Sequence, residues 1–254
     1  MLETIKRDRA ENVKIYTDNE NICQKFYNGV INSQHDKSEI VSDPPKKRRI
    51  DYDGSPNITV VNSTSLIEAL KFEKPMILNF ASAIHPGGGY IRGANAQEEC
   101  LCRSSTLYPV LKPFEHFYSF HKDSSDTRYS DIMIYSPEIT FFRDDYGFMM
   151  DKPVDISVLT AAAPNNRNKH ISNDDLRKIF EHRIRKVFLI AEHHRHKNLI
   201  LGAWGCGAFA CDPDIVAKAF STVIFSSTWD FSNLVFAIAD TVENKLVNTF
   251  RKHL

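Results

Sequence analysis

The chain has 254 residues, 42% hydrophobic and 25% charged, which is long enough for one large domain or for a domain with an extension. Lys plus Arg and Asp plus Glu both number 32, and this balance excludes a protein drawn to nucleic acid or membranes by its overall charge. The sequence has no long apolar run and no signal-peptide core, so we expect an intracellular protein, in the cytoplasm or nucleus, that contacts no membrane.

The first 57 residues are predicted to form a helical extension and a linker. Residues 1–35 have an imperfect helical spacing of apolar residues, which also allows two short helices. The apolar anchors of this segment are Ile5, Val13, Ile22, Phe26 and Val30. Residues 36–57 are rich in Ser, Asp, Pro and charge, as linkers are. Their basic cluster, Lys46–Arg49, indicates a nuclear-import signal, a polyanion contact or an ordinary solvated linker.

The first predicted strand is the apolar run Ile58–Val61. Thr64 and Ser65 follow it and can cap a short helix. A second apolar run, Met76–Leu78, predicts a buried strand that ends close to Asn79, a candidate polar contact for a ligand.

Three consecutive glycines follow this buried strand. Gly87, Gly88 and Gly89 carry no side chains, so their backbone can adopt positive φ and let a ligand approach closely. Glu98 and Glu99 then stand at the start of a predicted helix and point about 100° apart, so they cannot share one role. The helix N-terminus favours the ionised carboxylates, whereas burial and mutual repulsion favour protonation. The alternative is a simple glycine turn beside first-turn glutamates.

The middle of the chain predicts two closely spaced strands. Residues 113–131 read as a polar loop that carries aromatic side chains. The short apolar runs 132–135 and 139–142 flank a Ser-Pro-Glu turn, which predicts a hairpin or adjacent strands. Residues 144–147 form a further turn, and 154–160 a further strand.

Regular helix and strand patterns alternate to the end of the chain. The expected elements are a helix over 172–194, a strand over 199–201, a helix over 213–225, a strand over 233–239 and a helix over 241–252. His193, His194 and His196 end the long helix, where we expect them to be solvated rather than metal-bound. The odd number of cysteines, five, suits a reducing compartment, and the single zinc-like pair, Cys206 and Cys211, does not make a metal site.

A second glycine-rich loop lies between the strand at 199–201 and the next helix. Backbone N–H groups of such a loop, together with the helix N-terminus, can bind a diphosphate. The loop residues assigned to this role are Gly205, Cys206, Gly207, Ala208 and Phe209. The loop has no Gly-Lys-Ser/Thr ending, so a nucleoside-triphosphatase is not indicated. Taken alone, a strand–glycine–helix turn with Phe209 in the core is the alternative.

The stretch from Gly87 to Glu99 resembles the motif of the poly(ADP-ribose) glycohydrolase family: three glycines, seven residues, then Gln97-Glu98-Glu99. The surrounding words, His-Pro-Gly-Gly-Gly-Tyr and Ala-Gln-Glu-Glu-Cys-Leu-Cys-Arg, are similar to its bacterial-type (microbial) branch. The resemblance implies an α/β fold, a three-layer α/β/α sandwich with a mixed sheet like that of macrodomains. The helical extension and linker would occupy 1–57 and the catalytic domain 58–254. Departures from the family pattern are Ser82, Ala210 and Cys211.

The resemblance also implies a reaction and roles for residues. The family hydrolyses ribose–ribose bonds of poly(ADP-ribose) and releases ADP-ribose, with exo-action in this branch. Glu99 would be the general acid and base, and Glu98 would hold ribose hydroxyls. Gly87–Gly89, Asn79, Asn95 and Gln97 would contact the scissile ribose and phosphates, and Gly205–Phe209 the diphosphate and a ribose, with adenine near Thr64 and Ser65. We expect no metal, no cofactor and a monomer whose partners are poly(ADP-ribose) or ADP-ribosylated proteins.

Three other functions stay open from the sequence. The first is a macrodomain that binds ADP-ribose without cleaving it, although such a protein has no need of a second carboxylate. The second is a hydrolase for another ADP-ribosyl linkage. The third is a nucleic-acid-binding module that uses Lys46–Arg49, which the zero net charge disfavours.

Overall fold

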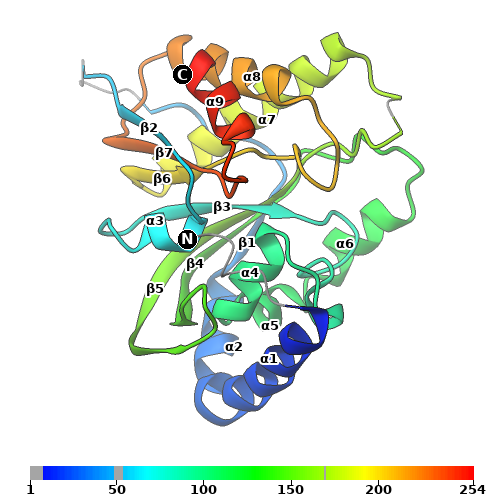
Figure 1. The fold of residues 1–254 in the computed structure, drawn as a ribbon, viewed down its shortest axis with the longest axis vertical. Coiled ribbons are helices and arrows are strands. Elements are labelled where there is room, and N and C mark those ends of the chain that lie inside the picture. Colours follow the sequence, from blue (N-terminus) through cyan, green and yellow to red (C-terminus); the bar gives the residue numbers. More distant parts are fainter. Residues whose placement is uncertain (1–7, 49–53, 169) are drawn as a thin grey trace.

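The computed structural model describes residues 8–48, 54–168 and 170–254. Within these residues a seven-stranded mixed sheet lies between two layers of helices (Figure 1). The predicted α/β/α sandwich is therefore confirmed.

The strands are β1 (Glu39–Val41), β2 (Asn57–Val61), β3 (Met76–Ala81), β4 (Met133–Arg143), β5 (Met149–Ala162), β6 (Asn198–Leu201) and β7 (Asn233–Ala237). The helices are α1 (Arg9–Ile22), α2 (Asn28–Lys37), α3 (Ser65–Ala69), α4 (Gln97–Ser104), α5 (Leu107–Leu111), α6 (Glu115–Lys122), α7 (Asn173–His193), α8 (Pro213–Phe225) and α9 (Lys245–His253). A π-helical turn, η2 (Cys23–Tyr27), joins α1 to α2, and a 3-10 turn, η3 (Tyr90–Arg92), precedes α4.

The sheet order explains where a ligand site can form. The strands are arranged β1-β4-β5-β3-β6-β7-β2, and the five from β5 to β2 run parallel to one another. β4 is antiparallel to both of its neighbours, β1 and β5. The loops that leave the carboxyl ends of the parallel strands therefore meet at one edge of the sheet, which is where open α/β sheets bind ligands.

The central strand β3 is buried on both faces. Met76 and Leu78 pack into the core beneath α7, α8 and α9, whereas Ile77 packs against α3, α4 and α5. This alternation follows from the two-residue period of a strand, and burial on both sides is typical of parallel strands. β3 therefore gives a rigid base to the glycine stretch that follows it.

Capping residues fix the starts of three predicted helices. The Thr64 hydroxyl accepts from the amide of Ile67 at the start of α3, and Ser172 caps α7 in the same way. Asp212 caps α8, with Pro213 at its first position, as the sequence predicts.

Three predicted local structures were wrong. Residues 113–131 contain α6, whose buried side chains Phe117, Tyr118 and His121 were expected in a loop. The expected hairpin within 132–142 is one strand, β4, because Pro137-Glu138 forms an irregularity in the register with Glu138 at φ 56° and not a reversal. The linker also contains β1, which pairs with β4. At the C-terminus, α9 begins four residues later than expected.

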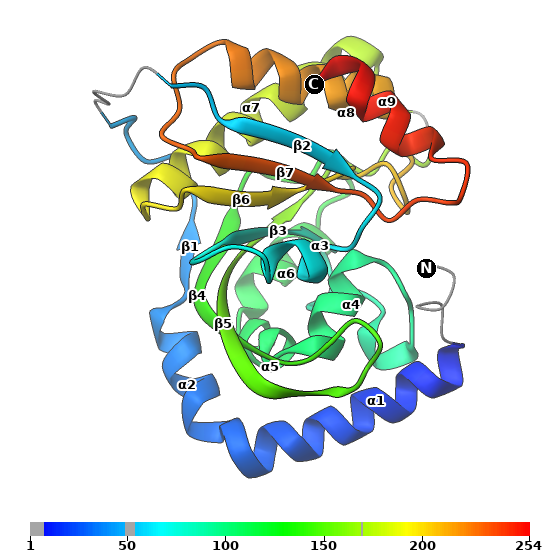
Figure 2. The same cartoon turned by 60° about the vertical axis from the view of Figure 1, so that its left-hand side comes forward.

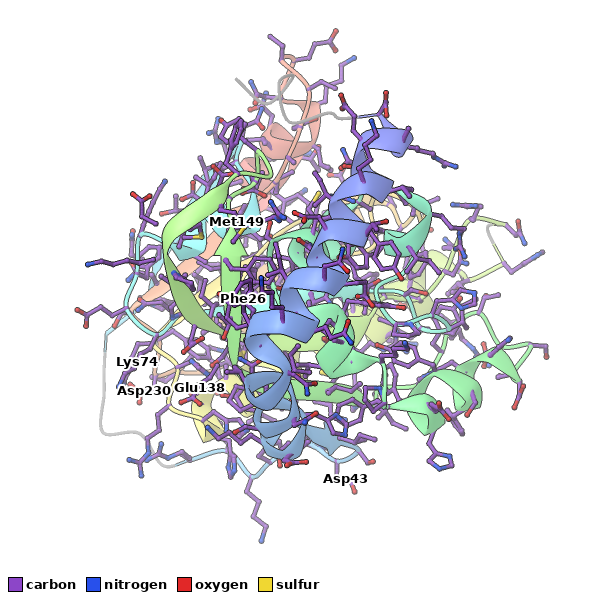
Figure 3. All side chains as sticks on the ribbon, turned by 90° about the horizontal axis from the view of Figure 1, so that it is seen from below. Phe26, Asp43, Lys74, Glu138, Met149 and Asp230 are labelled. Carbon is purple, nitrogen blue, oxygen red and sulfur yellow. The ribbon has the colours of Figure 1, made fainter. Side chains whose placement is uncertain are left out.

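The hydrophobic anchors predicted for the N-terminal helices were also wrong. Phe26 is 64% exposed, Val13 and Val30 are exposed as well, and Ile22 is half-buried, while Ile5 lies outside the described residues. The buried residues of α1 are instead two asparagines, Asn12 and Asn19. Figure 3 looks onto this face of the molecule, where the N-terminal helices cross it and Phe26 is labelled.

The basic cluster is not simply solvated. Lys47 Nζ lies 3.6 Å from the centre of the Trp229 ring and donates to the Thr228 carbonyl at 2.6 Å. Arg48 donates to the Glu192 carbonyl at 3.4 Å, and Arg49 lies outside the described residues. The expectation of a solvated linker is therefore wrong at Lys47.

The histidine cluster at the end of α7 differs from the solvated arrangement that we expected. His193 is exposed, but His196 is buried, within 2.9 Å of the Tyr135 hydroxyl.

The described part of the chain has no group of three His, Cys, Asp or Glu side chains placed to hold a metal. All five cysteines are thiols. None of the helices in the described ranges is both long and apolar enough to cross a membrane.

Candidate active site

The two glutamates lie where α4 begins, beside the loop that follows β3. Glu99 occupies the third position of α4, and its Oε2 atom accepts a hydrogen bond from the Ala96 amide at 3.0 Å, as in a capping box. Its Oε1 atom accepts from the Gly89 amide at 2.8 Å. Two backbone amides therefore hold the Glu99 carboxylate against the glycine triplet.

Glu98 points into the protein and is 3% exposed. Its Oε2 atom accepts from the Ser82 amide at 2.7 Å, and its Oε1 atom accepts from Asn79 Nδ2 at 3.4 Å. Burial and, to a smaller extent, the neighbouring Glu99 together raise the pKa of Glu98 to about 8, while the Ser82 and Asn79 hydrogen bonds oppose the shift. Glu98 is thus a neutral carboxyl group near pH 7, able to donate as well as accept a hydrogen bond.

The glycine triplet packs directly against both carboxylates. Gly87 and Gly88 have φ of 65° and 59°, in the left-handed region that glycine adopts most easily. A Cβ atom on Gly88 would lie 2.7 Å from Glu99 Oε1 and 3.0 Å from Glu98 Oε2. On Gly89 it would lie 2.7 Å from Ala94 Cβ. The backbone of the triplet is therefore approached closely by the two glutamates, and the predicted approach of a ligand to it stays a prediction.

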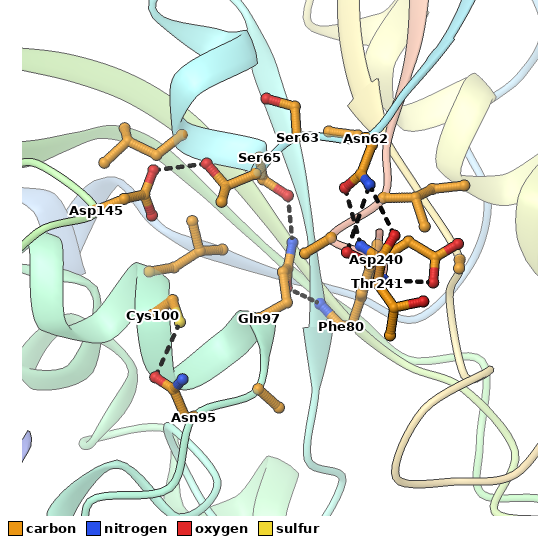
Figure 4. A pocket seen from close by; sticks show the side chains of 18 of the residues that line it. Asn62, Ser63, Ser65, Phe80, Asn95, Gln97, Cys100, Asp145, Asp240 and Thr241 are labelled. Carbon is orange, nitrogen blue, oxygen red and sulfur yellow. Dashed lines mark hydrogen bonds between the residues drawn. The ribbon is translucent and has the colours of Figure 1, made fainter. Parts of the chain in front are cut away.

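Gln97 joins α4 to the elements beside it. Its Nε2 atom donates to the Ser65 hydroxyl at 3.0 Å, and its Oε1 atom accepts from the Phe80 amide at 2.9 Å (Figure 4). The same Nε2 atom also donates to the Leu78 carbonyl at 2.8 Å. These bonds fix the orientation of α4 on β3. The Gln97 amide therefore holds the helix in place as well as lining the cavity described next.

A cavity of about 650 Å³ opens at the carboxyl ends of β2, β3, β6 and β7 (Figure 4). Its walls are formed by Asn62, Ser63, Thr64, Ser65, Leu66, Phe80, Asn95, Ala96, Gln97, Cys100, Leu101, Asp145, Ala203, Ala237, Ile238, Ala239, Asp240, Thr241, Val242 and Asn244. The volume is in the range of small-molecule sites. Glu98 and Glu99 are not wall residues, but the cavity adjoins them through Asn95–Gln97. Thr64 and Ser65, the region expected to lie near adenine, line this cavity.

Several polar wall residues were not singled out from the sequence. Thr64 donates to Asp145 Oδ2 at 2.6 Å, which ties the tip of the β4–β5 hairpin to α3. On the opposite wall, Asn62 Nδ2 donates to Asn244 Oδ1 at 2.6 Å and to the Asp240 carbonyl at 3.4 Å. These residues come from separate loops. The sequence therefore marks them as candidate ligand contacts only by their position after the ends of strands.

Asn79 and Asn95 lie in different surroundings. Asn79 is fully buried, donates to Thr160 Oγ1 at 3.2 Å, and faces Glu98 rather than the cavity. Its Oδ1 atom has no hydrogen-bond partner within the described residues. Asn95 lies on the cavity wall, and its Oδ1 atom accepts from Arg103 Nη2 at 2.5 Å. Asn79 thus contacts Glu98 and lies away from the cavity, whereas Asn95 lines the cavity.

The second glycine loop starts beside the end of β3. A Cβ atom on Gly202 would lie 3.0 Å from the Phe80 ring and 2.6 Å from the Ala237 carbonyl, so the base of the loop is wedged between β3 and β7. Gly205 has φ 81°, and a Cβ there would lie 2.8 Å from Ala163 Cβ. Two predicted glycine loops therefore leave adjacent strands, β3 and β6, at the same edge of the sheet.

The outer part of this loop is open. Gly207 and Ala208 are exposed, and a Cβ on Gly207 would meet no atom within 4 Å. Phe209 is half-buried, with its ring 6.1 Å from that of Tyr129, so it is neither a core residue nor fully exposed. Ala210 has φ 52°, a left-handed conformation that costs energy for a residue with a side chain. Of the whole loop, only Ala203 lines the 650 Å³ cavity.

Comparisons with known proteins agree with this geometry. The family model described as microbial-type PARG, catalytic domain, matches residues 5–144, more than half of the chain. No curated protein sequence matches. The crystal structure of poly(ADP-ribose) glycohydrolase (PARG) from Thermomonospora curvata is similar with a TM-score of 0.89 and 31% identity, over 97% of this chain and 100% of that chain. The same enzyme bound to the inhibitor ADP-HPD gives a TM-score of 0.86, with 31% identity and the same coverage.

A PARG from Deinococcus radiodurans in complex with ADP-ribose has a TM-score of 0.77 and 30% identity, over 88% of this chain and 96% of that chain. The sheet, the paired carboxylates and these matches together define a glycoside hydrolase with a macrodomain-like fold. Within that class, the chain belongs to the microbial-type PARG family.

Proposed function

We propose that this protein hydrolyses the ribose–ribose O-glycosidic bonds of poly(ADP-ribose), acts from the chain end and releases ADP-ribose. The observation that carries the proposal is the pair Glu98 and Glu99, held in unequal surroundings against the backbone of Gly87–Gly89. The similar structures bound to ADP-ribose and to ADP-HPD support the same ligand class.

In this mechanism Glu99 moves the proton. Cleavage breaks the bond between the ribose carbon and the leaving ribose oxygen, and Glu99 gives its proton to that oxygen. A water then loses a proton to Glu99 and bonds through its oxygen to the electron-deficient ribose carbon. The Gly89 and Ala96 amides hold the Glu99 carboxylate in place for both steps.

Glu98 holds the sugar. Because burial raises its pKa to about 8, its carboxyl group is neutral near pH 7 and can both donate to and accept from ribose hydroxyls. A neutral Glu98 also adds no negative charge that would repel the Glu99 carboxylate formed when the proton leaves. Asn79 donates to Glu98 and orients it.

The rest of the ligand extends along the edge of the sheet. The 650 Å³ cavity, lined by Thr64 and Ser65, accepts the adenosine part, and Asn95 and Gln97 lie between that cavity and the glutamates. The backbone of Gly205–Ala208 binds the diphosphate, and Phe209 packs on a ribose.

Product analysis with purified poly(ADP-ribose) tests this function. We expect the wild type to release ADP-ribose, and Glu99→Gln to lose at least about a thousandfold in turnover because general acid–base catalysis contributes on that scale. Glu99→Gln should still bind ADP-ribose in calorimetry. Glu115→Gln, which changes an exposed glutamate of α6, is the matched control and should behave as the wild type.

The outcomes separate the alternatives. Turnover like that of the wild type in Glu99→Gln would remove Glu99 from the catalytic role. If neither protein releases ADP-ribose while both bind it, the protein is a binding module or acts on another ADP-ribosyl linkage. Mono-ADP-ribosylated protein is then the substrate to test.

We also infer that the protein acts inside cells as a monomer. Sedimentation at micromolar concentration should give the mass of one chain. A fluorescent fusion compared with a fusion in which Lys46–Arg49 are replaced by alanine tests whether this cluster directs nuclear import. Because Lys47 is held on Trp229, import through this cluster requires that contact to open.

A further inference from the structure

Helix α1 buries polar side chains where it meets the rest of the molecule. Asn12 and Asn19 are 0% and 1% exposed, and their seven-residue spacing puts both on one face of the helix. Buried amides are tolerated only where they form hydrogen bonds. The groups that accept hydrogen bonds from these two amides therefore show which part of the molecule holds α1 in position.

The two asparagines bond to the catalytic end of the molecule. Asn12 Nδ2 donates to the Gly93 carbonyl at 3.1 Å, and Asn19 Nδ2 donates to the Arg103 carbonyl at 2.7 Å and to the Tyr90 hydroxyl at 3.2 Å. Tyr90 and Gly93 belong to the connection between the glycine triplet and α4, and Arg103 lies on α4 itself. Figure 2 shows α1 passing beneath α4.

The backbone of α1 also comes close to this connection. Gly93 has φ 73°, and a Cβ atom there would lie only 2.3 Å from the Arg9 carbonyl oxygen. The Tyr16 ring, on the same face of α1, meets the Tyr90 ring edge-on with centres 5.1 Å apart. The connection is therefore held along much of α1 rather than at one point.

A short chain of hydrogen bonds leads from this contact to Glu99. The Ala94 amide donates to the Gly89 carbonyl at 3.1 Å, and the Gly89 amide donates to Glu99 Oε1 at 2.8 Å. Arg103 Nη1 donates to the Ala94 carbonyl at 2.5 Å and ties the same connection to α4. A displacement of Gly93 would therefore move the amide that holds the Glu99 carboxylate.

We propose that Asn12 and Asn19 are positioning residues through which α1 fixes the Gly89 amide against Glu99. The proposal rests on the catalytic role given to Glu99 above. The space between the glycine triplet and Glu99 is small, because a single carbon added to Gly88 would lie 2.7 Å from Glu99 Oε1. The family match, which begins at residue 5, includes α1 in the catalytic unit.

Gln34 offers a matched control for a purely structural role of these amides. It is a buried amide on α2, and its Nε2 atom donates to the Glu138 carbonyl at 2.5 Å and to Thr140 Oγ1 at 2.8 Å. Both acceptors belong to β4, and the Gln34 Oε1 atom accepts from Thr106 Oγ1 at 2.6 Å, past the C-terminal end of α4 and away from the connection between the glycine triplet and α4. Its loss should therefore lower stability without disturbing Glu99.

The test compares Asn12→Ala, Asn19→Asp and Gln34→Ala with the wild type. Asn19→Asp keeps an oxygen that accepts from Arg143 Nε and replaces the donating amide with a carboxyl oxygen, which repels the Arg103 carbonyl. Backbone amide exchange over residues 87–95, kcat on poly(ADP-ribose) and ADP-ribose affinity are measured for each. For both asparagine variants we expect exchange to rise and kcat to fall, each about tenfold, while affinity changes less than about twofold.

Gln34→Ala should lower the melting temperature and leave both the exchange over 87–95 and kcat unchanged. Wild-type exchange over 87–95 in folded Asn12→Ala would overturn the proposal, as would an equal loss of kcat in Gln34→Ala. If the wild type itself releases no ADP-ribose, the proposed function fails, and the exchange measurement alone then decides whether α1 fixes this segment.

Discussion

The two glycine-rich loops leave adjacent strands, yet their glycines serve different needs. At Gly88 the backbone lies so close to Glu98 and Glu99 that any side chain would displace a carboxylate. At Gly207 a side chain would meet no protein atom within 4 Å. The packing of the protein itself requires the first glycine, whereas the second borders open space.

This difference matches the roles proposed above, catalysis beside the first loop and ligand binding at the second. The first loop is packed, hydrogen-bonded to its glutamates and held from beneath by α1, as a site that must place a proton donor accurately should be. The second loop is firm at its base, where Gly205 packs on Ala163, and open at its tip. Composition alone makes the two loops look alike.

The largest contrast should come from alanine at the two glycines. Gly88→Ala places a residue at φ 59° and a Cβ atom 2.7 Å from Glu99 Oε1. Because the Glu99 side chain is the part that can move, we expect kcat to fall about a hundredfold or more, with a loss of about 1–2 kcal/mol in the free energy of unfolding. Turnover assays and chemical denaturation measure the two effects.

Gly207→Ala is the matched variant for the open loop. Its free energy of unfolding should stay within about 0.5 kcal/mol of the wild type, since no protein atom opposes the added carbon. Any loss of ADP-ribose affinity in this variant would then be a direct effect on the ligand. A destabilisation as large as that of Gly88→Ala would erase the contrast between the loops.

An intermediate effect is expected at Phe209. Its ring is half-buried and adjoins Tyr129, so Phe209→Ala should fold but lose part of a ligand-binding surface. We expect ADP-ribose affinity to fall about tenfold, as for loss of one aromatic contact. Titration calorimetry measures the affinity and circular dichroism the fold. An unfolded Phe209→Ala would show that the ring belongs mainly to the core.

A last contrast is a dependence of stability on pH that comes from Glu98. Its folded pKa, raised to about 8, lies above the unfolded value, so the folded protein binds the extra proton. This contribution to stability is complete below about pH 4.5 and is lost as the pH rises through about 8. Wild-type stability relative to Glu98→Gln should therefore fall between these values when both are denatured across the range. A constant difference would place the Glu98 pKa near that of an ordinary glutamate.

Much of the site could be predicted because its residues are close together in sequence. The glycines, Gln97 and the two glutamates lie within thirteen residues, and helix caps such as Thr64 and Asp212 carry a local signal. The wall residues Asn62, Asp145 and Asp240 could not be predicted in this way. Three distant loops bring them together, and no local pattern marks them.

The errors at the N-terminus have one physical cause. A search for apolar spacing selected Phe26 and Val30, which are exposed, and passed over Asn12 and Asn19, which are buried. A helix that packs on the protein through buried amide side chains has no hydrophobic stripe by which its sequence could reveal the buried face. The strand irregularity at Glu138 is a similar case, because Pro137-Glu138 resembles a turn until the pairing of β4 with β5 is known.

The arrangement of the first two strands has a consequence for folding. β1 and β2 are neighbours in the chain but form opposite edges of the sheet. β2 pairs with β7, which places Asn57 opposite Asn233, so this edge can close only after residues 233–237 have left the ribosome. Contacts so distant in sequence slow folding. A chain that stops before Asn233 would present β2 as an unpaired strand, open to association with other chains during synthesis.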